Sequence, residues 1–252
     1  MNQSLRDKVI FVTGASSGIG RETSLDLARQ GAVLVLADVN EKDGLSLVEE
    51  IQAAGGRARF VKLNVCDGAA VAEVMAGIAE TEGRLDVAIN NAGVEHTNQR
   101  LADIDEKVWD RTLDVNLKGV WLCMKYEIQQ MLKQGGGHII NLASVAGLKG
   151  APTLAPYAAS KFGVVGLTKT AAMEYAREGV RVNAVCPSFI RTPMVQRVLD
   201  MDPSIEKKLA RSNPMQRLGE TQEVSRVIAW LCTDDSSFIT GQAIAIDGGL
   251  TA

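Results

Sequence analysis

Seven short runs of β-branched and other apolar residues, separated by longer helical segments, constrain the fold of this 252-residue chain more than any other feature. Runs such as VIFVT at 9–13 and VLVLA at 33–37 are almost wholly apolar, which is typical of parallel strands covered by helices on both faces. Strict alternation of such strands with helices predicts an α/β, Rossmann-like, doubly wound fold. We expect one mostly parallel seven-stranded sheet with helices on both faces and ligands at the carboxyl ends of its strands.

The predicted elements follow each other along the whole chain. Strands are expected at residues 9–13, 33–37, 58–63, 87–90, 138–143, 180–185 and 243–247. Helices are expected at residues 20–30, 43–54, 69–82, 105–133, 157–177 and 222–231. Because no linker, repeat or low-complexity tract interrupts this order, residues 1–252 are expected to form a single domain.

One long insertion, residues 188–219, breaks the alternation. It is rich in Met, Pro and polar residues and has room for one or two short helices. Loops of this length in compact domains are usually functional lids or disordered segments. We therefore predict a lid over the substrate, with a packed surface excursion as the alternative. The apolar side of the insertion consists of Met194, Val195, Val198, Leu199 and Met201.

Charge and composition exclude several classes of partner. The net charge is −3, and no run of like charge occurs, so neither nucleic acid nor an anionic membrane is expected. The polar start lacks the layout of a signal peptide, and no apolar stretch reaches the roughly 20 residues of a membrane helix. The four cysteines are dispersed without a CxxC pair. This spacing favours reduced thiols in a cytoplasmic protein over a metal site or a disulfide framework.

A glycine-rich turn, TGASSGIG at 13–20, follows the first strand and opens the first helix. Glycines here allow a sharp turn and close approach of a pyrophosphate, which the helix N-terminus favours electrostatically. Asp38, 24 positions after Gly14, ends the second strand and can accept hydrogen bonds from ribose hydroxyls. It would repel a 2′-phosphate, and the neutral residues Ser17, Val39 and Asn40 offer no compensating charge. The pattern favours NAD(H) over NADP(H); a solvated strand-end aspartate is the alternative.

Three residues have the chemistry of alcohol oxidation. Tyr157 and Lys161 are four positions apart in a helical segment and share one face, while Ser144 follows an apolar strand. A free tyrosine titrates near pH 10. An ammonium within ~4 Å, at an effective dielectric near 20, would favour the phenolate by about 4 kcal/mol, or roughly three pKa units, as an upper bound. Taken alone, the three residues are equally compatible with a helix aromatic, a snorkelling lysine and a helix cap.

The full set of motifs resembles the short-chain dehydrogenase/reductase family over essentially the whole chain. The motifs, in order, are TGASSGIG at 13–20, Asp38, NNAG at 90–93, Asn116 in VNLKG, Ser144, Tyr157 with Lys161, Pro187 in NAVCPSFIRT, and TGQAIAIDGG at 240–249. The resemblance implies a catalytic set in which Tyr157 transfers the proton and Ser144 orients the substrate oxygen. Lys161 would also hold the nicotinamide ribose, and Asn116 would hold a water through the backbone of a kinked helix.

The resemblance also implies a set of residues that bind the cofactor NAD(H). They are Gly14, Ser16, Ser17, Gly18, Ile19, Gly20, Asp38, Val39, Asn64, Val65, Asn91, Ala92, Gly93, Tyr157, Lys161, Pro187, Ile190 and Thr192. Two positions depart from the family pattern. Asn64-Val65 stands where the family often has Asp-Val, and Asn64 can still accept a hydrogen bond from adenine. Pro187-Ser188 stands where the family usually has Pro-Gly, which adds a side chain where cofactor and substrate meet.

The expected substrate pocket is mostly apolar, which favours a hydrophobic ketone or secondary alcohol. Its predicted walls are Ser144, Glu95, His96, Val145, Ala146, Leu148, Leu154, Ser188 and Phe189. Glu95 and His96 are the polar exceptions and could bind a polar substituent. The segment 157–177 is apolar nearly all round and so requires burial on two sides. The family resemblance implies a homotetramer in which this helix and 105–133 form one interface and the C-terminal segment another.

The resulting prediction is an NAD-dependent enzyme that acts on CH–OH groups by hydride transfer, without a metal. A 3-oxoacyl-thioester reductase acting on an acyl carrier protein is an alternative, although Asp38 and the lack of a basic cluster count against it. A non-catalytic NAD(H)-binding sensor or scaffold is a second alternative. Extended-type epimerases share the Tyr/Lys pair but usually have a longer C-terminal substrate domain.

Overall fold

A seven-stranded parallel sheet forms the centre of the molecule. The computed structural model describes residues 4–202 and 204–252. The strands lie in the order β3-β2-β1-β4-β5-β6-β9, and every neighbouring pair is parallel. Their bounds are β1 Val9–Thr13, β2 Val33–Asp38, β3 Arg57–Lys62, β4 Val87–Asn90, β5 Gly137–Leu142, β6 Val180–Pro187 and β9 Ala243–Ile246. The predicted doubly wound α/β fold is confirmed.

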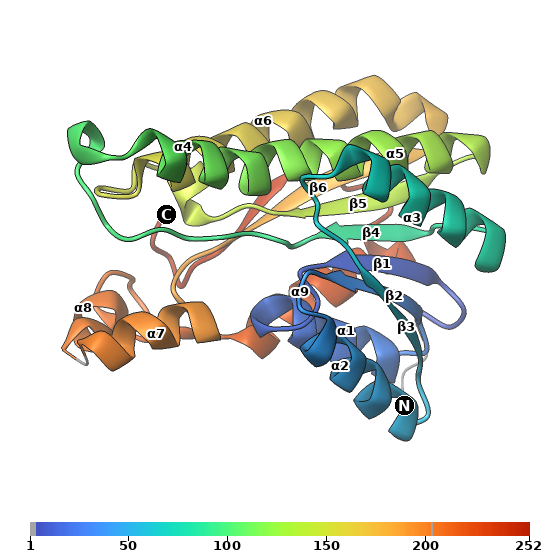
Figure 1. The fold of residues 1–252 in the computed structure, drawn as a ribbon, viewed down its shortest axis with the longest axis horizontal. Helices are drawn as coiled ribbons and strands as arrows, with labels where there is room; N and C mark the ends of the chain where they lie inside the picture. Colours follow the sequence, from blue (N-terminus) through green and yellow to red (C-terminus); the bar gives the residue numbers. More distant parts are fainter. Residues whose placement is uncertain (1–3, 203) are drawn as a thin grey trace.

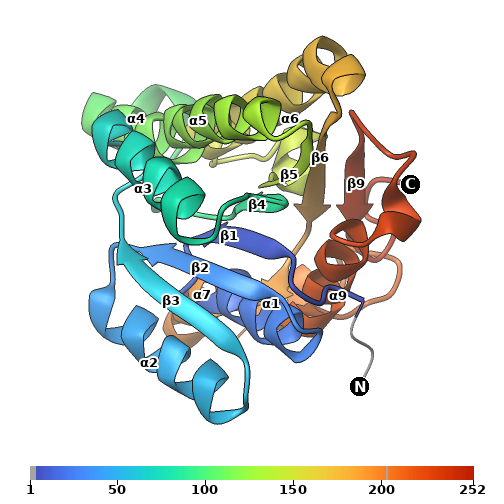
Figure 2. The same ribbon diagram turned by 90° about the vertical axis from the view of Figure 1, so that its right-hand side faces the viewer.

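Helices cover both faces of this sheet (Figures 1 and 2). One layer contains α1 (Gly18–Arg29), α2 (Glu41–Ala53) and α9 (Thr221–Leu231), and the other contains α3 (Gly68–Thr81), α4 (Glu106–Leu113), α5 (Gly119–Lys133) and α6 (Ala155–Tyr175). In β1, Val9 and Phe11 pack in the core under α3 and α5, whereas Ile10 and Val12 pack in the core under α1 and α9. Burial of both faces explains why these strands are continuously apolar.

The winding changes direction at β1. From β1 the chain builds outward through β2 and β3 and then returns to place β4 on the other side of β1. The crevice for a ligand in such a sheet lies at the carboxyl ends of the strands where the order reverses, here β1 and β4. Residues 13–20 and 90–93 follow these two strands, so the topology places both motifs at one site.

The predicted helix 105–133 contains an irregularity. A π-helical turn, Asp114–Lys118, joins α4 to α5, and Asn116 lies within it. π-turns widen the hydrogen-bonding pattern by one residue and are often found at functional sites. The π-turn lies at the position where the family resemblance implied a kinked helix.

The insertion 188–219 lies beyond the carboxyl ends of the strands. It contains α7 (Pro193–Met201), α8 (Ile205–Ala210) and one strand, β7 (Ile190–Arg191), which pairs with β8 (Gly219–Glu220) at its far end. Figure 1 shows α7 and α8 standing on the opposite side of the strand ends from α4 and the start of α6. Leu199 is buried, and Met194, Val195 and Val198 are half-buried. The side chain of Met201 lies outside the described residues.

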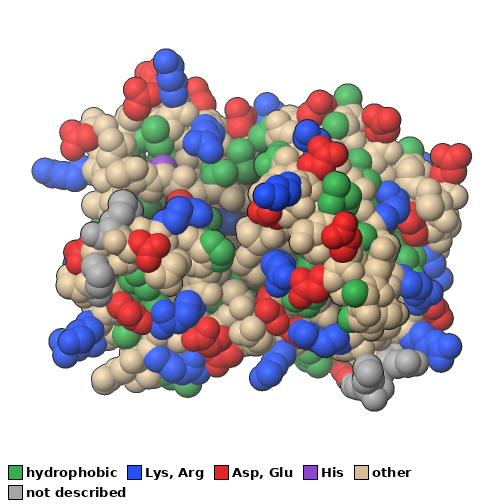
Figure 3. All heavy atoms as spheres, turned by 60° about the horizontal axis from the view of Figure 1, so that its bottom comes forward, with side chains coloured by type: hydrophobic (Ala, Val, Ile, Leu, Met, Phe, Trp, Pro, Cys, Tyr) green, Lys and Arg blue, Asp and Glu red, His purple; other side chains and the backbone are tan. Residues whose placement is uncertain are grey.

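Charges of both signs alternate on the surface in Figure 3, which shows no large field of one sign on that face. No helix in the described part of the chain is long and apolar enough to span a membrane. Within the same residues, no group of His, Cys, Asp and Glu side chains has the arrangement of a metal site. The four cysteines are free thiols.

Candidate active site

The glycine-rich turn packs directly against the segment that follows β4. Gly14 has φ +62°, and a Cβ atom there would lie 2.8 Å from the Cα of Ala92. The amide of Asn91 donates to the carbonyls of Thr13 (3.0 Å) and Gly14 (2.8 Å). The hydroxyl of Thr13 in turn accepts from the N–H groups of Asn91 and Ala92, both at 3.1 Å. Thr13, which the sequence analysis did not single out, therefore holds two predicted cofactor segments together.

The start of α1 has the geometry of a phosphate site. Arg21 is the first residue of this helix whose N–H donates to a carbonyl, that of Ser17, at 3.2 Å. The N–H groups of Gly18, Ile19 and Gly20 precede it and are therefore orphan helix donors. A Cβ on Gly20 would lie 2.2 Å from the carbonyl oxygen of Gly14, so the turn closes only around glycine. A cradle of this kind fits the pyrophosphate of a dinucleotide.

Asp38 is oriented by its neighbours at the end of β2. One carboxylate oxygen accepts from the N–H (3.0 Å) and the hydroxyl (2.6 Å) of Ser16, and the other accepts from the N–H of Asn40 at 2.9 Å. Val39, next to it, is 63% exposed and free to contact an adenine ring. An oriented carboxylate beside an open apolar surface fits the adenosine half of the cofactor.

The two residues after β3 differ in their surroundings. Asn64 is exposed, and its amide oxygen accepts from the N–H of Cys66 at 3.1 Å. Val65 is buried, and a Cβ on Gly119 would lie 2.7 Å from its side chain. Any contact of Val65 with a cofactor would therefore come from its backbone.

Ser144, Tyr157 and Lys161 converge at the carboxyl end of β5. Lys161 is buried, donates to the carbonyl of Leu142 at 2.7 Å, and lies 5.5 Å from the ring centroid of Tyr157. The hydroxyl of Ser144 lies within hydrogen-bonding reach of Tyr157 and accepts from the N–H of Ala146 at 3.1 Å. The spacing of these three residues along the chain is thus realised as one cluster.

Burial governs the titration of this cluster. It raises the pKa of Tyr157, while the hydrogen bond with Ser144 lowers that pKa and the charge of Glu95 raises it further. Burial also lowers the pKa of Lys161 to about 8. The residue spacing alone predicts that the charge of Lys161 is the largest influence on the pKa of Tyr157. The structure instead shows Lys161 bonded to a backbone carbonyl, with desolvation as the largest influence on Tyr157.

Asn116 clamps the loop that leaves β4. Its amide oxygen accepts from the N–H of Val94 at 2.7 Å, and its amide nitrogen donates to the carbonyl of Val94 at 2.8 Å. A Cβ on Gly93 would lie 3.3 Å from that amide oxygen and 3.8 Å from Nζ of Lys161. Gly93 therefore leaves the approach to both residues open.

The residues predicted to form the substrate walls differ in their burial. Val145 and Ala146 are buried, whereas Leu148, Leu154, Ser188 and Phe189 are half-buried. Pro187 and Ile190 flank Ser188 and Phe189; Ile190 is buried, and a Cβ on Gly219 would lie 2.5 Å from it. Thr192 caps α7 through a hydrogen bond from the N–H of Val195 at 3.3 Å and lies next to Gly18.

One ion pair crosses from the loop after β4 to the insertion. Arg197 of α7 donates to Glu95 at 3.3 Å. Burial raises the pKa of Glu95, and Arg197 lowers it. Nothing in the sequence indicated this pairing, because the two residues are 102 positions apart.

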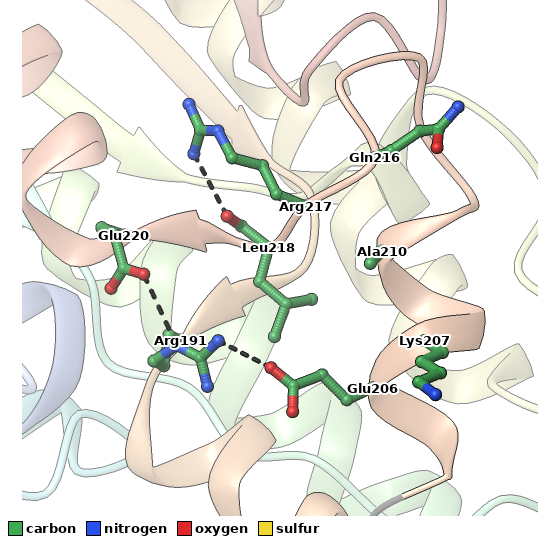
Figure 4. Close-up of a pocket in the computed structure, with 8 residues that line it drawn as sticks. All are labelled: Arg191, Glu206, Lys207, Ala210, Gln216, Arg217, Leu218 and Glu220. Atoms are coloured by element: carbon green, nitrogen blue, oxygen red, sulfur yellow. Dashed lines mark hydrogen bonds and ion pairs between the residues drawn. The ribbon is translucent and has the colours of Figure 1, made fainter.

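A cavity of about 550 Å³ lies at the base of the insertion and away from the predicted catalytic residues (Figure 4). Arg191 donates to Glu206 at 2.7 Å and to Glu220 at 3.4 Å, which ties α8 to the β7–β8 pair. These ion pairs are exposed, so each contributes little to stability. The residues that line this cavity therefore hold the insertion in place.

A buried polar cluster braces the sheet behind the site. Asn90 donates to Glu127 and to Asn141, both at 3.0 Å, and Asn141 donates to Thr168 at 2.9 Å. Glu127 on α5 is fully buried, and burial raises its pKa to about 8. One oxygen of Glu127 and the amide oxygen of Asn90 have no hydrogen-bond partner among the described residues. The burial of Glu127 could have been predicted from the sequence, because Glu127 lies on the same helix face as the buried Met124, Ile128 and Met131.

Comparison with known proteins decides the family. A family model described as enoyl-(acyl carrier protein) reductase, which belongs to the short-chain dehydrogenase/reductase group, matches residues 14–251. The chain is 39% identical to a cyclohexanol dehydrogenase of an Acinetobacter species over 252 residues, covering 100% of this chain and 98% of that one. This chain belongs to the short-chain dehydrogenase/reductase family.

Two further similarities extend across the whole of this short-chain dehydrogenase/reductase. It is 42% identical over 247 residues to the 3-oxoacyl-[acyl-carrier-protein] reductase of Thermotoga maritima, with 98% of each chain covered. The crystal structure of a levodione reductase superposes with a TM-score of 0.93 at 35% identity and covers 97% of both chains. The chain is therefore an oxidoreductase of this family with a Rossmann-type fold.

Proposed function

We propose that the protein is an NAD(H)-dependent dehydrogenase or reductase that acts on a secondary alcohol or its ketone, with Tyr157 as general acid/base. The observation that supports this most is the convergence of Ser144, Tyr157 and Lys161 beside Gly93, at the strand ends where the glycine turn also lies. These residues fit a nicotinamide dinucleotide, which would supply the hydride acceptor or donor.

The mechanism follows from the positions of these side chains. In oxidation, Ser144 holds the substrate oxygen and Tyr157 takes the hydroxyl proton. A nicotinamide cofactor held by the glycine turn and by Asp38 would supply the acceptor for the hydride that the carbinol carbon loses. Lys161 stabilises the phenolate by its charge. The proton leaves along the π-turn at Asn116, whose side-chain amide is already hydrogen-bonded to the backbone of Val94. Reduction reverses each step.

The preference for NAD(H) rests on Asp38. Its two oxygens are oriented by Ser16 and Asn40 and are available to ribose hydroxyls. A 2′-phosphate at this point would meet a carboxylate at close range, and Lys62, opposite Asp38 on β3, is already paired with Glu41 at 3.1 Å, which makes the phosphate unfavourable. NADP(H) is therefore expected to bind more weakly.

Substrate, assembly and location are part of the same proposal. The half-buried walls Leu148, Leu154 and Phe189 suit a compact apolar ring, and a cyclohexanol dehydrogenase is among the relatives. Trp109, Trp121 and Phe162 are exposed on α4, α5 and α6, which supports a homotetramer that covers this face. Trp230 and Phe238 mark a second exposed face near the C-terminal segment. A cytoplasmic location agrees with the four free thiols.

A second candidate is a 3-oxoacyl-thioester reductase of acyl carrier protein, which the similarity to the Thermotoga maritima enzyme favours. Figure 3 shows no basic field on its face that would attract an acidic carrier protein. A sensor that binds NAD(H) without catalysis would have no use for the assembled Ser144–Tyr157–Lys161 cluster.

The decisive experiment measures reduction of NAD⁺ and NADP⁺ with secondary alcohols, hydroxyacyl thioesters, steroids and sugars. Tyr157→Phe is compared with the wild type, and Tyr126→Phe serves as a matched control outside the cluster. We expect turnover with NAD⁺ that falls at least 10³-fold in Tyr157→Phe only, as expected when a general acid/base contributing roughly 10²–10⁴-fold is lost together with substrate orientation. Preference for NADP⁺ and thioesters would favour the second candidate. Binding of NADH without turnover would favour a sensor.

A further inference from the structure

The carboxylate of Glu95 lies near the predicted catalytic residues, because its charge acts on Tyr157. We propose that Glu95 determines specificity by accepting a hydrogen bond from a second hydroxyl group of the substrate. The preferred substrates are then secondary alcohols or ketones that carry a further hydroxyl. This inference rests on the proposed function and names its substrate class.

The backbone that carries Glu95 is held on both sides. Asn116 bonds both the N–H and the carbonyl of Val94, at 2.7 and 2.8 Å. Further along the loop, the N–H of Gln99 donates to the carbonyl of Thr153, just before α6, at 3.0 Å. The loop is therefore fixed at Asn116 and just before α6, the helix that carries Tyr157, and Glu95 directly follows the residue that Asn116 holds.

Glu95 lies close enough to Tyr157 for the two groups to interact electrostatically. Its charge raises the pKa of Tyr157, which by itself opposes formation of the phenolate. A substrate hydroxyl that donates to the carboxylate would disperse this charge when the substrate is bound. The charge of Glu95 therefore opposes the Tyr157 phenolate least when the bound substrate carries such a hydroxyl donor.

The carboxylate has unused acceptor capacity. Among the residues that the structure describes, Arg197 is the one hydrogen-bond donor to Glu95, at 3.3 Å, whereas an ionised carboxylate offers about four acceptor positions. Burial raises the pKa of Glu95, so the carboxylate is partly shielded from water.

His96, the next residue, has a second acceptor without a donor. Its Nδ1 lies 2.8 Å from the carbonyl of Thr97 and must carry the proton, so Nε2 of the neutral ring is an acceptor. This Nε2 is buried and has no partner in the described part of the chain. Two adjacent residues thus lack hydrogen-bond donors, which a hydroxylated ligand would supply.

The donor is a hydroxyl rather than an ammonium group. Arg197 is paired with Glu95, and the ammonium of Lys161 lies 5.5 Å from the ring centroid of Tyr157. A cationic ligand would therefore meet positive charge without a net negative counter-charge. A neutral hydroxyl meets no such repulsion.

The test compares kcat/KM for cyclohexanol with that for the 1,2-, 1,3- and 1,4-cyclohexanediols, using NAD⁺. The variants are Glu95→Met, which keeps the length of the side chain, and Glu106→Met, the same substitution at an exposed position of α4. We expect the wild type to favour at least one diol. Loss of a hydrogen bond to a charged group corresponds to roughly 10- to 100-fold, so Glu95→Met should lose that much on the diol, mainly in KM, and about threefold or less on cyclohexanol.

Several outcomes would overturn the inference. They are equal activity of the wild type on diols and cyclohexanol, an equal loss on both substrates in Glu95→Met, or the same loss in Glu106→Met. Each of these leaves the proposed function intact, because cyclohexanol is still oxidised. A wild type that oxidises none of these alcohols would refute the proposed function itself.

Discussion

Replacing the buried Glu127 with glutamine should stabilise the protein, and the size of the effect can be worked from its surroundings. Burial raises the pKa of Glu127 from its ordinary value of 4.5 to about 8. The folded state therefore keeps a proton that the unfolded state releases above pH 4.5. The free energy of unfolding falls as pH rises from 4.5 to 8, by about 1.4 kcal/mol per pH unit. At pH 7 the accumulated loss is about 3 kcal/mol.

Glutamine removes this loss without removing the contacts. In protonated Glu127 the O–H would satisfy the amide oxygen of Asn90, which otherwise has no donor, while the other oxygen accepts from the amide nitrogen of Asn90 at 3.0 Å. The amide nitrogen of glutamine can donate in place of that O–H, and its oxygen can still accept. Glu127→Gln therefore retains the hydrogen bond from Asn90, offers a donor to the amide oxygen of Asn90, and no longer titrates.

The assay is thermal and denaturant unfolding at pH 5 and pH 7, at one protein concentration. We expect Glu127→Gln to exceed the wild type by about 3 kcal/mol at pH 7, or roughly 6–12 °C in Tm, and by less than about 1 kcal/mol at pH 5. Glu174→Gln, at an exposed position of α6, is the matched control and should change neither value. Equal stability of wild type and Glu127→Gln at pH 7 would show that Glu127 is ionised and compensated in the folded protein. A variant less stable at both pH values would refute the hydrogen-bonding scheme.

Three further predictions follow from buried or crowded positions. Burial lowers the pKa of His138 from 6.5 to about 3, so the unfolded state binds the proton first and stability falls as pH drops from 6.5 towards 3. His138→Gln should reduce that loss by about 2 kcal/mol at pH 5 in a pH series of unfolding, and an unchanged slope would contradict this. Gly20→Ala places a Cβ 2.2 Å from the carbonyl of Gly14, whereas Gly77→Ala on α3 meets nothing within 4 Å. Fluorescence titration should show NADH binding weakened at least tenfold by the first substitution alone; equal binding by both variants would remove the glycine turn from the cofactor site. Asn116→Leu removes both side-chain bonds to Val94 and should lower kcat more than it weakens NADH binding, a split that steady-state kinetics beside titration can test.

The parts of the fold that depend on backbone and burial could be predicted from the sequence. Strands such as Val9–Thr13 and Val87–Asn90 have the predicted bounds, because continuous apolar runs are stable only between two helix layers. Differences of two residues occur at both starts and ends of elements: α1 begins at Gly18 rather than residue 20, since the glycine turn itself enters the helix, and β6 ends at Pro187 rather than residue 185. The convergence of Ser144, Tyr157 and Lys161 also followed, because all three lie at the carboxyl end of one strand or on the helix beside it.

The side-chain pairs that tune the site could not be predicted in this way. Glu95 and Arg197, or Glu127 and Asn90, are joined across 102 and 37 positions, and no period in the sequence relates them. Their effects also depend on burial. A glutamate on the surface is ionised at neutral pH, whereas burial raises the pKa of Glu127 to about 8, so that it keeps its proton. Sequence patterns therefore locate the strand ends where chemistry occurs. The substrate preference proposed above would rest on such a long-range pair, because Glu95, which is paired with Arg197, acts electrostatically on Tyr157.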